Sequence, residues 1–238
     1  MDYFIRTDIT EKELIKILDS KNYFLGNDSN WGFELDDSGK PIPYLYKNRD
    51  KISRRFAKFA NIIEKLNMRN VLEIGCGLGF LLHELKERDI NCIGIDIAEW
   101  AVRHALYPPW DLNMMVASAT SLPFKDKSFD LIFSIDVFEH VLASKVPTLI
   151  SECARVGKFN LHLISTEPSG LDRDKTHVTL MPMEWWRKQA PSPDFLIVEA
   201  YGSWAIEVKG KLIHLQIGEG FKEMQDIRKN INVGLING

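Results

Sequence analysis

The stretch Val71–Gly79, which reads Val-Leu-Glu-Ile-Gly-Cys-Gly-Leu-Gly, is the feature that most constrains the fold of this chain. It begins as a short apolar strand, continues through three glycines at alternate positions, and leads into a segment with helical spacing. Glycine permits a tight turn with positive φ and lets the backbone approach a ligand at the N-terminus of a helix. The stretch therefore predicts a strand–turn–helix unit whose backbone contacts a ligand.

A second expected strand, Cys92–Ile95, is followed at once by an acid, Asp96. Asp96 lies 19 residues beyond Gly77, close to the spacing of about 20 residues at which a carboxylate takes the hydroxyls of a ribose. This spacing favours a nucleoside site over a structural turn with an incidental surface acid. Phe80 stands where a dinucleotide fingerprint has its third glycine, and no Lys-Ser/Thr pair follows the turn, as a Walker loop requires.

The motif also resembles the first motif of the class I S-adenosylmethionine-dependent methyltransferases. In that family an apolar strand and an acid precede G-x-G-x-G, matched here by Glu73, Gly75, Gly77 and Gly79. The resemblance covers roughly residues 60–165 and includes several motifs in the family's order. It implies that S-adenosylmethionine is the cofactor, with Glu73 and the glycine turn orienting it.

Three later motifs extend the resemblance. Asp96 corresponds to the family's ribose-binding acid, with Ile97 beside the adenine. The motif Ser118–Phe124 keeps the family pattern except for its leading Asp, so a hydroxyl or backbone group near Ala119 would contact the adenine amine more weakly. The motif Phe129–Val141 has the family's Glu-His-Val ending. The cofactor site implied by the resemblance comprises Glu73, Gly75, Cys76, Gly77, Gly79, Asp96, Ile97, Ala119, Thr120, Ile135 and Asp136.

From residue 71 onward, short apolar runs alternate with helical segments, which predicts βαβ units and a parallel sheet covered on both faces. Strands are expected at Val71–Ile74, Cys92–Ile95, Met114–Val116, Phe129–Ile135, Asn160–Ile164, Phe195–Glu199 and Leu212–Gln216. Helices are expected near 79–88, 98–106 and 137–156, the last interrupted or ended early by Pro147. With the resemblance, this pattern implies a Rossmann-like α/β fold. Its sheet would have seven strands, mostly parallel, with an antiparallel last strand.

The first 70 residues read as helical with an irregular middle. Thr10–Glu13 has the form of a capping box, and Ser53–Leu66 has the periodicity of an amphipathic helix. We expect one domain over residues 1–238. Its parts would be a helical N-terminal lid over 1–60, a Rossmann-like core over 61–218 with an active-site insertion at 165–192, and a C-terminal helical tail over 219–238.

Composition excludes several classes of protein. The 238 residues carry 30 Lys and Arg against 33 Asp and Glu, a balance that disfavours a nucleic-acid-binding protein. No apolar run approaches the roughly 20 residues of a membrane span, and the charged N-terminus is not a secretory signal. Three cysteines without a CxxC pair predict a reduced, cytoplasmic protein with neither a disulfide framework nor a zinc site. The oligomeric state is left open as monomer or homodimer.

Two histidines are candidates for the chemistry, because imidazole titrates near working pH. His140 follows the fourth expected strand, at the rim where the methyl group would lie; alternatively, it and Glu139 only hold the loop. His177 lies in the long loop after the fifth strand, as a base or substrate orienter, or as the hydrogen-bond partner of Asp174. Acids of this loop could offer oxygen ligands to a cation, but charged loops are usually solvated, and no metal is expected.

These features together predict methyl transfer from S-adenosylmethionine to a small-molecule or glycan hydroxyl, with His177 or His140 assisting deprotonation. Two alternatives stay open, and a third, a nicotinamide dehydrogenase, is disfavoured by Phe80. One is methylation of nitrogen or carbon, including a protein side chain, on the same fold. The other is a catalytically silent module that binds the cofactor and regulates a partner.

Overall fold

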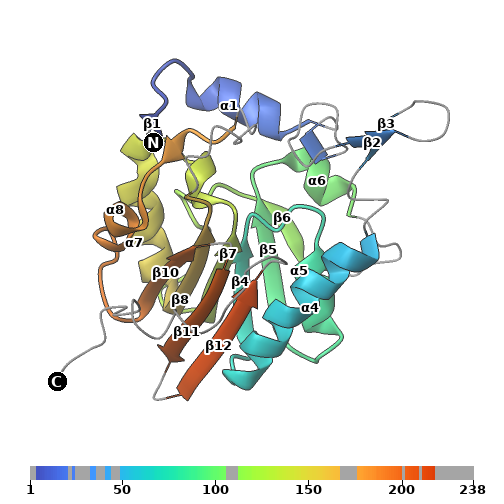
Figure 1. Cartoon of the computed structure of the whole chain (residues 1–238), viewed down its shortest axis with the longest axis vertical. Coiled ribbons are helices and arrows are strands. Elements are labelled where there is room, and N and C mark those ends of the chain that lie inside the picture. Colours follow the sequence, from blue (N-terminus) through green and yellow to red (C-terminus); the bar gives the residue numbers. More distant parts are fainter. Residues whose placement is uncertain are drawn as a thin grey trace.

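The computed structural model describes residues 4–20, 23–24, 33–35, 41–43, 49–105, 112–166, 176–199, 202–208 and 211–217. Its centre is a six-stranded parallel sheet in the order β10-β8-β7-β4-β5-β6 (Figure 1). The strands are β4 (Asn70–Ile74), β5 (Asn91–Asp96), β6 (Met114–Val116), β7 (Phe129–Ile135), β8 (Gly157–Ile164) and β10 (Phe195–Glu199). The prediction of an α/β fold with a parallel sheet is confirmed.

Alternate residues of each central strand pack on opposite faces of the sheet. In β4, Val71 joins the core formed with α4 (Arg49–Lys65) and α5 (Phe80–Lys86). Its neighbour Leu72 joins the core formed with α7 (Val146–Val156) and α8 (Met183–Arg187). Because both faces are buried, these strands are continuous apolar runs, which explains why the sequence identified them.

The strand order places a switch point between β4 and β7. From β4 the chain continues outward through β5 to β6, whereas β7, β8 and β10 extend in the other direction. Crossovers at this point leave a crevice outside the carboxyl ends of the strands, which is where α/β sheets of this kind bind ligands.

The expected seventh, antiparallel strand does not join this sheet in the described part of the chain. Instead β11 (Gly202–Val208) and β12 (Lys211–Ile217) pair antiparallel as a separate hairpin, with Val208 opposite Lys211. Only two residues separate the strands, and so short a connection pairs neighbouring strands with each other. The prediction of a seven-stranded sheet is therefore wrong for the described residues.

The expected helix over 137–156 is divided. Two short 3₁₀ segments, η1 (Phe138–His140) and η2 (Ala143–Lys145), precede α7, and Pro147 lies in the first turn of α7. Proline is favoured there because the first backbone N–H groups of a helix lack partners within it. Pro147 thus begins the helix rather than ending it. A further short helix, α6 (Glu99–Arg103), follows β5.

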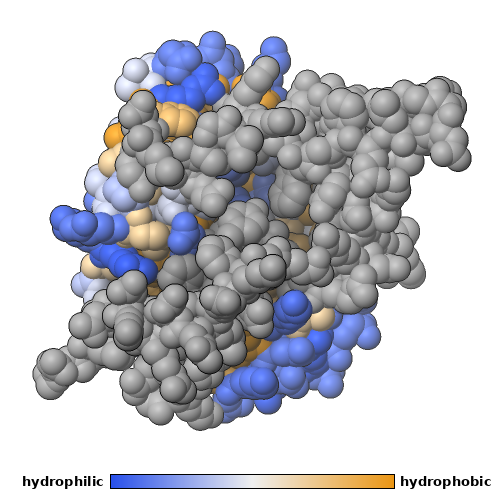
Figure 2. All heavy atoms as spheres, viewed as in Figure 1, coloured by the Kyte–Doolittle hydropathy of each residue, from blue (hydrophilic) through white to orange (hydrophobic). Residues whose placement is uncertain are grey.

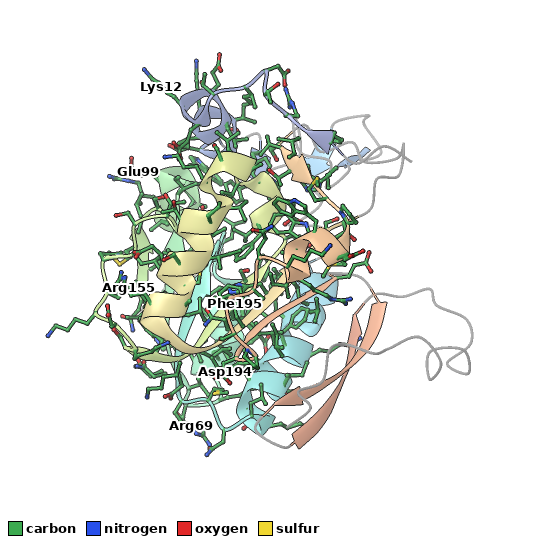
Figure 3. The ribbon with its side chains drawn as sticks, turned by 90° about the vertical axis from the view of Figure 1, so that its left-hand side faces the viewer. Lys12, Arg69, Glu99, Arg155, Asp194 and Phe195 are labelled. Atoms are coloured by element: carbon green, nitrogen blue, oxygen red, sulfur yellow. The ribbon has the colours of Figure 1, made fainter. Side chains whose placement is uncertain are left out.

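The N-terminal part covers the carboxyl end of the sheet. Helix α1 (Glu11–Leu18) begins at Thr10 with the expected capping box, in which Thr10 and Glu13 exchange hydrogen bonds. In Figure 3, Lys12 of α1 and Arg69, which precedes β4, lie at opposite ends of the molecule, so α1 lies across the end where the strands finish. Its outer side is hydrophilic (Figure 2), whereas Leu14 is buried.

Two short pairings complete the described chain. Strand β1 (Phe4–Ile5) pairs antiparallel with β9 (Thr179–Leu180). Strand β2 (Phe33–Leu35) pairs antiparallel with β3 (Pro41–Pro43), within the part of the first 70 residues that was expected to be irregular. No helix of the described residues has the length and apolarity needed to cross a membrane. The tail at 219–238 lies outside the described residues, so its expected helix stays a prediction.

Candidate functional site

A cavity of about 230 Å³ lies at the switch point, between the strand ends and α1. Its floor is formed by the glycine turn after β4 and by the ends of β5 and β7, and its cover by α1 and residues 23–24. All but one of the predicted cofactor residues line it: Glu73, Gly75, Cys76, Gly77, Asp96, Ile97, Ala119, Thr120, Ile135 and Asp136. The exception is Gly79.

The glycine turn has the conformation that its sequence demands. Gly75 and Gly77 have φ of 70° and 49°, values that residues with a Cβ rarely adopt. A Cβ on Gly75 would lie 2.3 Å from Val137 Cγ2, which excludes any side chain without rearrangement. The backbone N–H groups of Gly75 and Cys76 both donate to the carbonyl oxygen of Ile95, at 2.8 and 3.0 Å, which fixes the turn against β5.

Gly79 has a structural role. It caps the N-terminus of α5 with φ of 83°, and an added Cβ would lie 2.7 Å from Leu112 and 3.2 Å from the sulfur of Met114. Gly79 therefore permits close packing behind the turn rather than contact with the cavity.

Asp96 connects the turn to the next loop. Its carboxylate oxygens accept the backbone N–H groups of Gly77 and Ala98, each at 2.8 Å. Burial raises the pKa of Asp96, and these two hydrogen bonds oppose that effect. Each carboxylate oxygen has two lone pairs, so both oxygens keep acceptor capacity toward the cavity.

Glu73 is a buried acid at the end of β4. It is 3% exposed, and its Oε2 has no hydrogen-bond partner among the described residues. Burial and the nearby charge of Asp96 raise its pKa well above the usual range. Burying such a group unpaired is costly, which suggests that it serves a ligand.

The wall beyond Asp96 contains the residue that departs from the family pattern. Ser118 lines the cavity with Ala119 and Thr120, and its hydroxyl is hydrogen-bonded to that of Thr120 at 2.9 Å. Neither side chain carries charge, so this wall offers hydroxyl and backbone groups in place of the expected carboxylate.

The two candidate histidines lie close together beside the cavity. His140 lines the cavity, and its ring centroid lies 4.7 Å from that of His177. His140 Nδ1 is hydrogen-bonded to the hydroxyl of Thr176 at 2.9 Å and to its carbonyl oxygen at 3.2 Å. Glu139 is fully buried beside them, and its Oε1 accepts the backbone N–H of Ser165 at 2.9 Å. Asp174, the expected partner of His177, lies outside the described residues.

Sequence reasoning predicted an N-terminal lid but did not single out the residues of it that line the cavity. Leu14, Ile15 and Leu18 of α1 line it, together with Tyr23 and Phe24. Leu14 and Leu18 stand four residues apart on one face of an amphipathic helix, a signal of burial. That signal does not say which surface the helix covers, so it gave no indication of a site.

Comparisons with known proteins agree with this geometry. A family model described as a methyltransferase domain matches residues 72–164. Ajmaline N-methyltransferase from Rauvolfia serpentina is 33% identical over 136 residues, which cover 54% of this chain and 46% of that protein. Ubiquinone biosynthesis O-methyltransferase from Chelativorans sp. (strain BNC1) is 26% identical over 114 residues, covering 46% and 44%. The chain thus spans about half the length of these curated relatives.

A solved structure agrees at the level of the fold. The crystal structure of a SAM dependent methyltransferase from Archaeoglobus fulgidus aligns with a TM-score of 0.52 at 24% identity, covering 61% of this chain and 71% of that one.

The parallel sheet, its glycine turn and the acid after the second strand define an α/β domain with a ligand cavity at the switch point. Residues 72–164 thus match the model of a methyltransferase domain, and the chain is similar to class I S-adenosylmethionine-dependent methyltransferases. S-adenosylmethionine is accordingly the cosubstrate of this family's site.

Proposed function

We propose that this protein transfers the methyl group of S-adenosylmethionine to a hydroxyl of a small molecule or a glycan. The observation that carries the proposal is the position of His140, which lines the cavity and contacts His177. An acceptor hydroxyl must lose a proton, and imidazole is suited to take it near neutral pH.

The residues of the cavity fit the cosubstrate. Glu73 offers a buried carboxylate oxygen to the ammonium group of the methionine part, Asp96 offers acceptor capacity to the ribose hydroxyls, and the turn beside Gly75 leaves room for the backbone to approach. When bound, the cosubstrate supplies a methyl group already activated on a sulfonium sulfur.

The chain's own residues would position the acceptor and receive its proton. The carbonyl oxygen of Thr176 can only accept a hydrogen bond, so we assign the ring proton of His140 to Nδ1. Nε2 is then the nitrogen with a lone pair for the acceptor's proton. Leu14, Ile15 and Leu18 line the cavity from α1 and would exclude water from the reacting groups.

A second candidate is transfer to nitrogen. The most extensive similarity given above is to an N-methyltransferase, whereas the O-methyltransferase relative is 26% identical. An amine acceptor also needs to be deprotonated before transfer, so the same histidines would serve it. Acceptor chemistry therefore has to be measured.

The test is the formation of S-adenosylhomocysteine from S-adenosylmethionine with panels of hydroxyl, amine and carbon acceptors, read by mass spectrometry. A methylated hydroxyl product supports the first candidate, and a methylated amine supports the second. Calorimetric titration with S-adenosylmethionine runs in parallel. If the protein does not bind S-adenosylmethionine but does bind another nucleotide, both candidates are contradicted.

We further propose that the protein is cytoplasmic, is a monomer or homodimer, and acts without a nucleic-acid or membrane partner.

A further inference from the structure

Two histidines and a carboxylate meet beside the cofactor cavity. One ligand atom each from Glu139, His140 and His177 lies within 4.8 Å of the others. Glu139 and His140 come from η1, just after β7, and His177 comes from the segment that leads into β9. The sequence did not predict this grouping, because about 36 residues separate its two parts.

We propose that Glu139, His140 and His177 bind a divalent first-row transition-metal ion. Two imidazoles and one carboxylate suit Zn²⁺, Fe²⁺, Co²⁺ or Ni²⁺, whereas Mg²⁺ and Ca²⁺ prefer oxygen ligands throughout. Three protein ligands leave at least one coordination position open, as in catalytic rather than structural metal sites.

The surroundings of the three residues resemble those that orient metal ligands. A ligating histidine usually donates its other ring N–H to a carbonyl or carboxylate, which fixes the ring. His140 Nδ1 lies 3.2 Å from the carbonyl oxygen of Thr176 and 2.9 Å from its hydroxyl. Glu139 is held in the same way, because Oε1 accepts the Ser165 backbone N–H at 2.9 Å.

The burial of these three residues favours a bound cation over a group of side chains that is simply hydrated. Glu139 is 0% exposed, and both imidazole rings are half-buried. In these low-dielectric surroundings the attraction between the Glu139 carboxylate and a bound cation is stronger than it would be in water. A cation would replace any proton that these groups share, because metal ligands must be deprotonated.

The position of the cluster indicates what the open coordination site would take. His140 lines the cavity, so an open position on the ion would face the cavity, where we propose that the acceptor enters. A bound cation lowers the pKa of a hydroxyl that coordinates it. This part of the inference rests on the proposed function, since it assumes that the acceptor enters here, and it assigns the histidines as ligands rather than as the base.

The experiment uses full-length, tag-free protein with Zn²⁺ in calorimetry and Co²⁺ in visible absorption. We expect one equivalent of each ion to bind, with Co²⁺ bands typical of nitrogen and oxygen ligands and no comparable binding of Mg²⁺. His140→Gln, His177→Gln and Glu139→Gln should each weaken Zn²⁺ binding at least tenfold. Gln at 139 keeps an acceptor for Ser165, and thermal melting checks that every variant folds.

His104→Gln is the matched control, because His104 is exposed and packs on Trp100 away from the cluster. It should bind Zn²⁺ as the wild type does. Absence of stoichiometric Zn²⁺ and Co²⁺ binding, or equal binding by the three cluster variants, overturns the cation site. If methyl transfer persists in that case, the proposed function stands; loss of S-adenosylmethionine binding contradicts the proposed function by itself.

Discussion

The carboxylate of Asp96 accepts the backbone N–H of Gly77 at 2.8 Å, although the two residues are 19 positions apart. The acid after β5 thus contacts the middle of the glycine turn after β4. One side chain both supports the turn and borders the cavity, so its loss affects the site in two ways.

Asp96→Ala should therefore weaken S-adenosylmethionine binding by about 1–3 kcal/mol, because a buried hydrogen-bonded carboxylate is lost. Calorimetric titration measures the change. Glu64→Ala, an exposed acid on α4, is the control for charge and should leave affinity unchanged. Wild-type affinity in Asp96→Ala would remove Asp96 from the site.

Gly75→Ala should disrupt the turn. The added Cβ would lie 2.3 Å from Val137 Cγ2, at a φ of 70°, and an alanine at such a φ costs about 1–2 kcal/mol even without the contact. We expect a lower melting temperature and weaker cofactor binding. The double variant with Val137→Ala removes the clash but keeps the backbone strain, so it should recover only part of the loss. No recovery in melting temperature would contradict the assigned contact.

Glu73→Gln should stabilise the protein without its cofactor while weakening cofactor binding. The raised pKa of Glu73 means that its charged form is disfavoured in the folded state, so stability is lost as pH rises through that pKa. Gln does not titrate, and the variant's advantage, about 1–3 kcal/mol, should be larger at pH 8 than at pH 5.5. Urea unfolding at both pH values measures it, and an advantage that shrinks with pH would contradict the assignment.

His162 should make the fold sensitive to acid. It is fully buried, its Nδ1 is hydrogen-bonded to Ser134 Oγ at 2.8 Å, and burial lowers its pKa to about 3. The unfolded chain takes up this proton near pH 6.5, so stability falls between pH 6.5 and about 3. From pH 7 to 4.5 the loss amounts to about 2–3 kcal/mol at 1.36 kcal/mol per unit.

His162→Gln keeps a partner for Ser134 and removes the titration. Its urea unfolding midpoint should fall less than that of the wild type between pH 7 and 4.5, although its stability at pH 7 is lower. Parallel curves for the two proteins would show that His162 does not govern the acid response.

His177→Ala should reduce turnover much more than cofactor affinity, because His177 contacts His140 and is not among the residues that line the cavity. Single-turnover methyl transfer and calorimetric titration separate the two effects. His104→Ala again serves as control. If the His177→Ala variant turned over at the wild-type rate, the role of His177 would be purely structural.

The cofactor end of the site was predictable because its signals are local. The glycine turn, Asp96 and the motif at Ser118 lie next to strand ends, and parallel strands bring their carboxyl ends to one edge. The glycine spacing does not distinguish the role of Gly79 from the roles of Gly75 and Gly77. Only the packing of Leu112 and Met114 against Gly79 shows that its role is different.

The acceptor end was less predictable because it depends on contacts distant in sequence. His140 and His177 were identified as separate candidates, but their contact depends on how the segment at 176–180 packs against η1, where the Val178 N–H donates to the Glu139 carbonyl. The pairing of the last two strands, by contrast, depends on a local feature. Only two residues, 209–210, separate β11 from β12, and so short a connection pairs the two strands with each other.

The short pairing of β1 with β9 joins the segment before α1 to the segment after His177. Phe4 stands opposite Leu180, and the Arg6 N–H donates to the Val178 carbonyl at 2.8 Å. The chain enters α1 just after one partner and leaves His177 just before the other. The pairing thus couples the position of the helix that covers the cavity to the position of the His177 imidazole.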